Sequence, residues 1–162
     1  LLSQKEKIQF FANHYLATEH IFFMGRGIDY ALSMEGSLKL KEISYIHSES
    51  YAAGELKHGT ISLITEDMPV IAVATQRDVL DKTVSNIKEV KSRGAFTIVV
   101  TREGTDFDKD VADILVTVPE TDDLLMPMTA VVPLQLIAYY TADLRGNDVD
   151  KPRNLAKSVT VE

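Results

Sequence analysis

The sequence predicts a three-layer α/β/α sandwich with a mainly parallel sheet of four or five strands, followed by an irregular C-terminal tail. Two observations lead to this fold class. Continuous apolar runs of strand length alternate with segments of helical periodicity, and glycines stand at several junctions between them. Strands that are apolar throughout, with helices between them, are typical of a parallel sheet covered on both faces. A chain of 162 residues suits a single domain of this kind.

The first third of the chain is predicted to contain a helix, a strand and a second helix. Residues 5–18 carry apolar side chains along one helical stripe. Residues 20–24, His-Ile-Phe-Phe-Met, are short and apolar enough for a buried strand, and the Gly-Arg-Gly that follows indicates a turn. Asp29 is a good helix cap, and the helix that it opens is expected to reach about Tyr45.

The rest of the chain continues the alternation of strands and helices. Buried strands are predicted at residues 68–75 and 96–101, with a helix at 79–92 between them. Residues 114–118 are expected to form a fourth, weaker strand. A last helix is expected from about residue 127 to residue 144.

Two segments do not fit this scheme. One is residues 48–59, which lacks a clear period, and the other is the chain after Gly146. We therefore divide the chain into a globular part, residues 1–146, and a C-terminal tail, residues 147–162. Irregular segments attached to a rigid sheet often carry function, so both are candidate parts of a site.

Composition excludes several classes of protein. The net charge of −7 is unfavourable for general nucleic-acid binding. The absence of cysteine excludes disulfides and thiolate metal sites and fits a cytoplasmic protein. No apolar run approaches the roughly 20 residues of a membrane span. The chain begins with neither methionine nor a signal peptide, so we expect it to be a piece of a longer protein.

Charged residues fall on the expected apolar face of the helix at 29–45. Glu35, Lys39 and Glu42 share one narrow strip, and apolar residues flank the strip on both sides. Charges in a buried position are candidates for acid–base chemistry, because burial shifts their pKa values. Lys39 is also within reach of both carboxylates. The alternative is a solvated row of ion pairs on a helix that buries another face, and periodicity alone leaves both interpretations open.

Three further residues are weaker candidates. His58 lies in an irregular stretch and could move protons during the ring opening of a sugar, or it could be a surface histidine. Arg26 stands in the Gly-Arg-Gly turn before a helix, where an anion could bind, but an ordinary tight turn is favoured. Lys157 could form a Schiff base if it were buried, and is otherwise a solvated charge. The four histidines and the carboxylates suggest no metal site.

Three stretches carry a specific resemblance: MEGSLKLKEISYIH at 34–47, ESYAAGELKHG at 49–59 and DKPRNLAKSVTVE at 150–162. Together they resemble the carboxyl-terminal region of the glucosamine-6-phosphate synthase family, the glutamine–fructose-6-phosphate aminotransferases (isomerizing). The resemblance extends over essentially the whole chain. It implies an enzyme that uses ammonia, released from glutamine in a separate amino-terminal domain, to convert fructose 6-phosphate into glucosamine 6-phosphate.

The resemblance also implies a place for each candidate residue. The family's isomerase part holds two flavodoxin-like sugar isomerase (SIS) subdomains, and residues 1–146 correspond to the second. Glu42 would move the proton between sugar carbons 1 and 2, with Lys39 assisting through the enol-like intermediate and Glu35 in the same cluster. His58 would open and close the sugar ring in the active site of the neighbouring subunit of a homodimer.

The tail completes the site that the resemblance implies. Lys157 would bind the open-chain sugar near carbon 2 and is the Schiff-base candidate, with Ala156 beside it; the substrate-binding residues would be Lys157, Ala156 and Glu42. The family's phosphate-binding loop lies in the first SIS subdomain, which this chain lacks together with the glutaminase domain. We therefore expect the chain alone to be folded but inactive. No cofactor, metal, nucleic acid or membrane partner is expected.

Three alternatives are kept open. The chain could be a non-catalytic sugar-phosphate sensor, although a sensor needs no proton shuttle and the combination of Glu42, His58 and Lys157 argues against it. It could be a self-standing phosphosugar isomerase that uses no ammonia, which the synthase-like tail disfavours. It could also be a structural module in which the charged strip is an inter-subunit cluster of salt bridges.

Overall fold

The computed structural model describes residues 4–105, 107–108 and 110–155. One five-stranded sheet forms its centre, in the order β2-β1-β3-β4-β5, and every neighbouring pair is parallel. The strands are β1 (His20–Gly25), β2 (His47–Ala52), β3 (Pro69–Ala74), β4 (Phe96–Arg102) and β5 (Ile114–Val118). The prediction of a three-layer sandwich around a parallel sheet is thereby confirmed.

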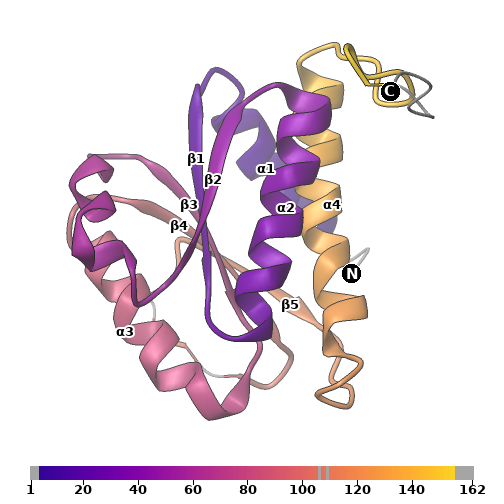
Figure 1. Ribbon diagram of the computed structural model, residues 1–162. Helices are drawn as coiled ribbons and strands as arrows, with labels where there is room; N and C mark the ends of the chain where they lie inside the picture. The colour runs from indigo at the N-terminus through magenta and orange to yellow at the C-terminus, as the bar shows by residue number, and fades with distance from the viewer. Residues whose placement is uncertain (1–3, 106, 109, 156–162) are drawn as a thin grey trace, which may run out of the picture.

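Helices cover both faces of the sheet (Figure 1). On one face lie α1 (Lys5–His14), α2 (Ile28–Ser44) and α4 (Met126–Leu144), whose apolar residues share one core with the sheet. On the other face α3 (Leu80–Lys91) packs in a second core. Short 3₁₀ turns complete the chain: η2 (Leu56–His58), η3 (Thr60–Leu63) and η4 (Arg77–Val79).

The two cores follow from the period of two along each strand. Ile71 and Val73 of β3 point into the core of α1, α2 and α4, whereas Val70 and Ala72 point into the core of α3. All six residues of β3 are buried. Strands buried on both sides are typically apolar along their length, which is why the continuous apolar runs predicted the central strands correctly.

The prediction that residues 48–59 are irregular is wrong at its start, because β2 forms there. β2 pairs with β1 in register from His20↔His47 to Gly25↔Ala52 and has no second neighbour. Its sequence, HSESYA, is mostly polar, as an edge strand tolerates. The first helix is also shorter than predicted, ending at His14 instead of residue 18.

The buried face of α2 is not the face that apolar periodicity indicated. Small and hydroxyl-bearing residues occupy it together with two leucines. Its members are Asp29, Leu32, Ser33, Gly36, Ser37, Leu40 and Ser44. The hydroxyls of Ser33 and Ser44 each donate to a carbonyl four residues earlier, at 2.8 and 2.6 Å, so they are buried without loss of hydrogen bonding.

Close packing explains this choice of small residues. A Cβ atom on Gly36 would lie 3.0 Å from side-chain atoms of both Leu134 on α4 and Phe23 on β1. The apolar residues Met34 and Leu38, predicted to be buried, are 46% and 44% exposed. The prediction that the charged strip lies near the middle of the buried face is therefore wrong.

None of the helices in the described part of the chain combines the length and the apolar character that crossing a bilayer requires.

Candidate functional site

The charged strip on α2 forms a compact ion-pair cluster. Lys39 Nζ lies 2.8 Å from Glu42 Oε2 and 3.7 Å from Glu35 Oε1, as the helical spacing predicted. The three side chains are partly exposed, at 35% for Lys39, 28% for Glu42 and 41% for Glu35. The strip therefore lies on the flank of α2, between the buried face and the exposed row of Ala31, Met34, Leu38 and Lys41. Of the two interpretations that the sequence left open, a solvated row of ion pairs describes its place in this chain.

The cluster determines the protonation state of Lys39. The hydrogen bond that Lys39 donates to Glu42 raises the pKa of the ammonium group, and the nearby charges of Glu42 and Glu35 add to this, against a smaller opposing effect of burial. Lys39 is therefore a cation across the neutral range. It can stabilise negative charge that develops on a substrate oxygen, whereas the base of the cluster must be a carboxylate.

His58 does not meet this cluster within one protomer. It lies at the end of η2, and the neighbouring Leu56 is buried in the α3 core, on the other side of the sheet from α2. Glu42 lies near the end of α2, beside the edge where β2 begins, whereas His58 follows the edge where β2 ends. The two residues therefore lie at opposite ends of β2, and no hydrogen bond or ion pair joins them within the described part of the chain.

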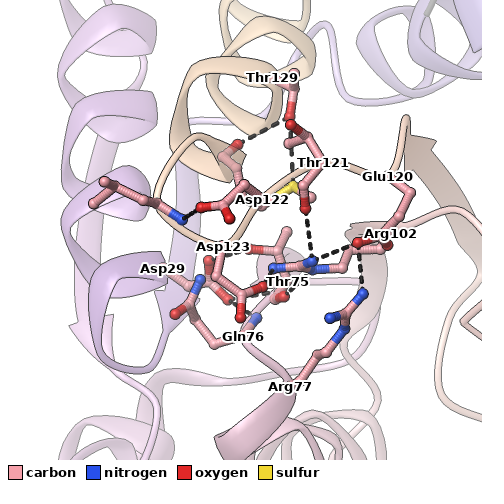
Figure 2. Close-up of polar contacts among 12 residues, drawn as sticks. Asp29, Thr75, Gln76, Arg77, Arg102, Glu120, Thr121, Asp122, Asp123 and Thr129 are labelled. Atoms are coloured by element: carbon pink, nitrogen blue, oxygen red, sulfur yellow. Dashed lines mark hydrogen bonds and ion pairs between the residues drawn. The ribbon is translucent and has the colours of Figure 1, made fainter.

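The carboxyl edge of the sheet, where doubly wound folds bind ligands, is occupied by an internal polar network (Figure 2). Asp29 is 1% exposed and accepts hydrogen bonds from Thr75 N at 2.6 Å, Thr75 Oγ1 at 2.6 Å and Gln76 N at 3.1 Å. Arg102, 3% exposed, donates to Thr75 O at 2.6 Å and forms ion pairs with Glu120 and Asp123. Asp29, Thr75 and Arg102 satisfy one another, which holds this edge together, but Gln76 Nε2 beside them is buried and has no hydrogen-bond partner among the described residues.

The prediction that Asp29 caps the helix is wrong, because its carboxylate accepts hydrogen bonds from the end of β3. The helix begins at Ile28, its N-cap residue is Gly27, and no side chain caps it. Asp29 lies in the first turn and bonds the end of β3 instead. Burial raises the pKa of Asp29, although the hydrogen bonds from Thr75 and Gln76 and the charge of Arg102 oppose that effect.

Arg26 is held away from the helix N-terminus. Its guanidinium donates to Asn86 Oδ1 on α3 through Nε at 3.1 Å and Nη2 at 2.8 Å. The turn itself is tight, because a Cβ atom on Gly25 would collide with the backbone carbonyl of Asp29. The interpretation of residues 25–27 as an ordinary turn is therefore confirmed.

The described part of the tail packs against the end of the helix that carries the charged strip. Asn147 Nδ2 donates to Ile43 O at 3.0 Å, and Arg153 N donates to the hydroxyl of Tyr45 at 2.9 Å. The guanidinium of Arg153 also lies 4.0 Å from the centre of the Tyr45 ring. Ala156 and Lys157 lie outside the described residues. Sequence reasoning missed Tyr45 and Arg153, which are 108 positions apart and form no local pattern.

Comparison with known proteins places this arrangement in a family. The model of the SIS domain matches residues 15–144, which is most of the chain. The chain belongs to the SIS domain family. The match covers every strand of the sheet and the helices α2, α3 and α4.

Individual relatives of this SIS domain are much longer than the chain. It is 57% identical over 162 residues to a glutamine–fructose-6-phosphate aminotransferase (isomerizing) from Clostridium acetobutylicum, and 56% identical to one from Caldanaerobacter subterraneus. The chain spans about a quarter, 27%, of each. Among solved structures it is similar to the C-terminal domain of glucosamine-fructose-6-phosphate aminotransferase from Francisella tularensis. That match has a TM-score of 0.85 and 39% identity over 93% of this chain and 43% of the other.

The hollow beside the charged strip is not lined by the strip itself. A hollow of about 530 Å³ lies beside α2 and β2, and its lining includes Met34, Lys41 and Tyr51 but neither Lys39 nor Glu42. Within the described residues, no group of three or more histidine, aspartate or glutamate side chains could hold a metal ion. A closed site around Lys39 and Glu42 would therefore need a surface from outside this segment.

Proposed function

We propose that this chain is the part of a glutamine–fructose-6-phosphate aminotransferase that moves the proton between carbons 1 and 2 of the sugar phosphate. The observation that carries the proposal is the Lys39–Glu42 pair, 2.8 Å apart, in a chain 57% identical along its whole length to such an enzyme. The absence of cysteine fits a place of action in the reducing cytoplasm.

The chemistry assigns one role to each member of the pair. The Glu42 carboxylate removes a proton from carbon 1 of the open-chain sugar, and the electrons of the broken C–H bond form a double bond to carbon 2. The charge that accumulates on the atom bound to carbon 2 is stabilised by the Lys39 ammonium group. Glu42 then returns the proton to carbon 2. The carbon 1 hydroxyl loses its proton as carbon 1 becomes an aldehyde, and the atom bound to carbon 2 gains one, so that the protons balance. A positioned carboxylate of this kind contributes a factor of about 10²–10⁴ in rate.

His58 and Lys157 take the steps before proton transfer. His58 opens the sugar ring. Lys157, which follows Ala156, condenses with the ketone at carbon 2 to form a Schiff base with release of water, and ammonia then displaces the lysine amine from carbon 2. His58 serves the site of the neighbouring subunit of a homodimer. Its place after the end of β2, whereas Glu42 precedes the start of that strand, supports a dimer in this proposal.

The remaining parts of the site come from outside this segment. The chain covers 27% of the curated relatives, and its own charged strip is partly exposed and does not line the hollow beside α2 and β2. In the proposed enzyme a first SIS subdomain covers this strip and supplies the phosphate-binding loop, while a glutaminase domain supplies ammonia. The substrate and product are fructose 6-phosphate and glucosamine 6-phosphate.

One observation favours a second candidate, a structural module. The charged strip lies on the flank of α2 with 28–41% of each side chain exposed, as an inter-subunit cluster of salt bridges would. In that case the Lys39–Glu42 coupling would contribute to assembly and not to the reaction.

The test is the isomerisation of fructose 6-phosphate to glucose 6-phosphate by the full-length enzyme with Glu42→Gln. We expect activity to fall by about 10² or more, with assembly unchanged. The control is Glu103→Gln, which alters an exposed carboxylate just after β4 and should leave activity unchanged. A Glu42→Gln enzyme that keeps its activity but no longer assembles would instead establish the structural module.

A further inference from the structure

The loop that carries His58 is fixed to the end of β1 by its backbone. Directly after β2, Ala53 N donates to Gly25 O at 2.8 Å, and Ala53 is 1% exposed. Leu56, which is 2% exposed, anchors the turn η2 in the α3 core. His58 N then donates to Glu55 O at 3.0 Å. His58 itself is exposed, but it follows a segment that is held at several points.

The side chain of Arg26 lies against this loop and joins it to α3. Its Nε and Nη2 both donate to Asn86 Oδ1, at 3.1 and 2.8 Å, and Asn86 is 8% exposed. Asn86 Nδ2 donates in turn to Glu89 Oε2 at 3.1 Å, so both ends of the amide are bonded. The same guanidinium packs on Gly54, where a Cβ atom would lie 2.7 Å from Arg26 Nη2. A free arginine would move aside from such a contact, but this one is held by Asn86.

We propose that Arg26 is a positioning residue for ring opening, which holds residues 53–58 so that His58 meets the closed sugar in a fixed place. The proposal rests on the proposed function, since ring opening by His58 belongs to it. In that step the hydroxyl on carbon 2 gives its proton to the His58 imidazole, and the bond between carbon 2 and the ring oxygen breaks. The ring oxygen takes a proton and becomes the hydroxyl on carbon 5. Arg26 itself touches no reacting atom.

The path from Arg26 to His58 is short. Gly54 precedes His58 by four residues, a stretch that spans at most about 14 Å when extended. It is shorter here, because Leu56–His58 forms one 3₁₀ turn. Such a turn moves as a unit, so a displacement at Gly54 is passed on to His58. A misplacement of about 1 Å in a catalytic group costs about 10² in rate.

The test compares two substrates of the full-length enzyme, one of which needs no ring opening. Fructose 6-phosphate closes its ring through the hydroxyl on carbon 5, whereas 5-deoxyfructose 6-phosphate lacks that hydroxyl and stays open. A residue that acts on ring opening affects the first substrate and spares the second. A variant that only weakens the fold lowers both rates alike. His58→Ala is the reference, and Arg93→Ala, at an exposed arginine just after α3, is the matched control.

We expect Arg26→Ala to lower kcat for fructose 6-phosphate by about tenfold or more, and to change kcat for the open substrate by less than about twofold. Arg26→Lys keeps the charge but not the forked donors, so it should fall between Arg26→Ala and wild type. Hydrogen–deuterium exchange of peptides that cover residues 52–58 should be about fivefold faster in Arg26→Ala, the equivalent of one net hydrogen bond.

Gly54→Ala tests the same contact from the loop. Its Cβ would displace the Arg26 guanidinium, so Gly54→Ala alone should reproduce the selective loss on fructose 6-phosphate. In a protein that already carries Arg26→Ala, the same change should lower kcat no further, because the side chain that it would meet is gone. If Arg26→Ala fails to fold, Arg26→Lys and Gly54→Ala make the same comparison.

The two proposals fail differently. A His58→Ala enzyme that loses both substrates equally would overturn the ring-opening role of His58, and the role of Arg26 with it. If His58→Ala loses only fructose 6-phosphate while Arg26→Ala keeps the wild-type kcat for it, the positioning role alone is overturned. Equal loss of both substrates in Arg26→Ala would make Arg26 a structural anchor only, which also contradicts the proposal.

Discussion

Lys39 Nζ and Glu42 Oε2 lie 2.8 Å apart on adjacent turns of α2, with more than a quarter of each side chain exposed. A cation and a carboxylate at this distance on an exposed surface stabilise a fold by little, about 1 kcal/mol or less. The pair is therefore poorly explained as a device for stability. In the proposed reaction it has a function, because one partner accepts the proton and the other stabilises the charge that results.

Replacing Lys39 separates these two roles. We expect Lys39→Met in the full-length enzyme to lower kcat for isomerisation by about 10²–10³, as the loss of a stabilising donor does elsewhere. Lys39→Arg, which keeps the charge, should retain more activity. Chemical denaturation should show nearly equal stability for all three proteins, and a Lys39→Met enzyme that unfolds much earlier would contradict this account.

The pKa of Lys39 adds a prediction about pH. The pKa is raised above the ordinary value of 10.5, chiefly by the hydrogen bond to Glu42, so the cation persists until the pH exceeds that value. Loss of the Lys39 charge should therefore not limit activity at any pH below about 10. The pH profile of kcat in wild type and Lys39→Arg should agree on the alkaline side. An alkaline limb near neutrality that Lys39→Arg removes would show that Lys39 titrates there.

Stability at low pH should depend on Asp113. Burial, the largest effect, raises the pKa of this carboxyl, but the bonds from Lys91, at 2.6 Å, and Thr97 outweigh it, and the pKa lies below the ordinary 3.8. Its contribution is thus complete above pH 3.8 and is lost as the pH falls through the lower, folded-state value.

We expect Asp113→Asn to destabilise the chain by about 1–2 kcal/mol at pH 7, and by less as the pH falls below 3.8. Urea unfolding at both pH values measures this. The control is Asp108→Asn, which removes the ion pair between Asp108 and Lys88. The Asp108 side chain is 79% exposed, so this variant should change the unfolding free energy little at either pH. Equal effects of Asp113→Asn at the two pH values would show that the carboxylate charge is not the cause.

The network at the carboxyl edge of the sheet should be required for folding. Asp29→Ala would leave two backbone N–H groups and the Thr75 hydroxyl without their acceptor, at a cost of about 3 kcal/mol or more. Asp29→Asn keeps one acceptor oxygen and should therefore lower the unfolding free energy by less than Asp29→Ala does. Unfolding free energies of the two variants give the comparison, and an Asp29→Ala protein as stable as wild type would show that water satisfies these groups.

The central fold could be predicted because its signal is local. All six residues of β3 and the centre of β4, Ile98 to Val100, are apolar, as is typical of strands buried on both sides. β2 was missed because an edge strand may be polar, and its place depends on pairing with β1 and not on its own composition.

The buried face of α2 was misjudged for a related reason. Ser33 and Ser44 satisfy their hydroxyls within the helix, and Gly36 admits α4, so polar and small residues pack where apolar ones were expected. The spacing of residues along the helix still predicted the Lys39 ion pairs correctly, because they depend only on how far apart Lys39, Glu35 and Glu42 lie in the sequence of one helix. The Tyr45–Arg153 contact joins residues 108 positions apart, and no local pattern predicts it.

The isolated 162-residue chain should not isomerise fructose 6-phosphate, because its charged strip is partly exposed and does not line the hollow beside α2 and β2. Adding the missing first SIS subdomain should restore activity, and Glu42→Gln in the mixture should remove it again. Turnover by the chain alone at the rate of the intact enzyme would contradict the proposal that the site is shared.

The most direct test of the shared site is to mix two inactive full-length enzymes, Glu42→Gln and His58→Ala, and to measure fructose 6-phosphate isomerisation after their subunits exchange. If His58 serves the neighbouring subunit, each mixed dimer keeps one intact site, and about a quarter of wild-type activity returns after random pairing. Mixing Glu42→Gln with Lys39→Met, two lesions on the same helix, should restore none. Mixed Glu42→Gln and His58→Ala dimers without activity would contradict a site shared between subunits.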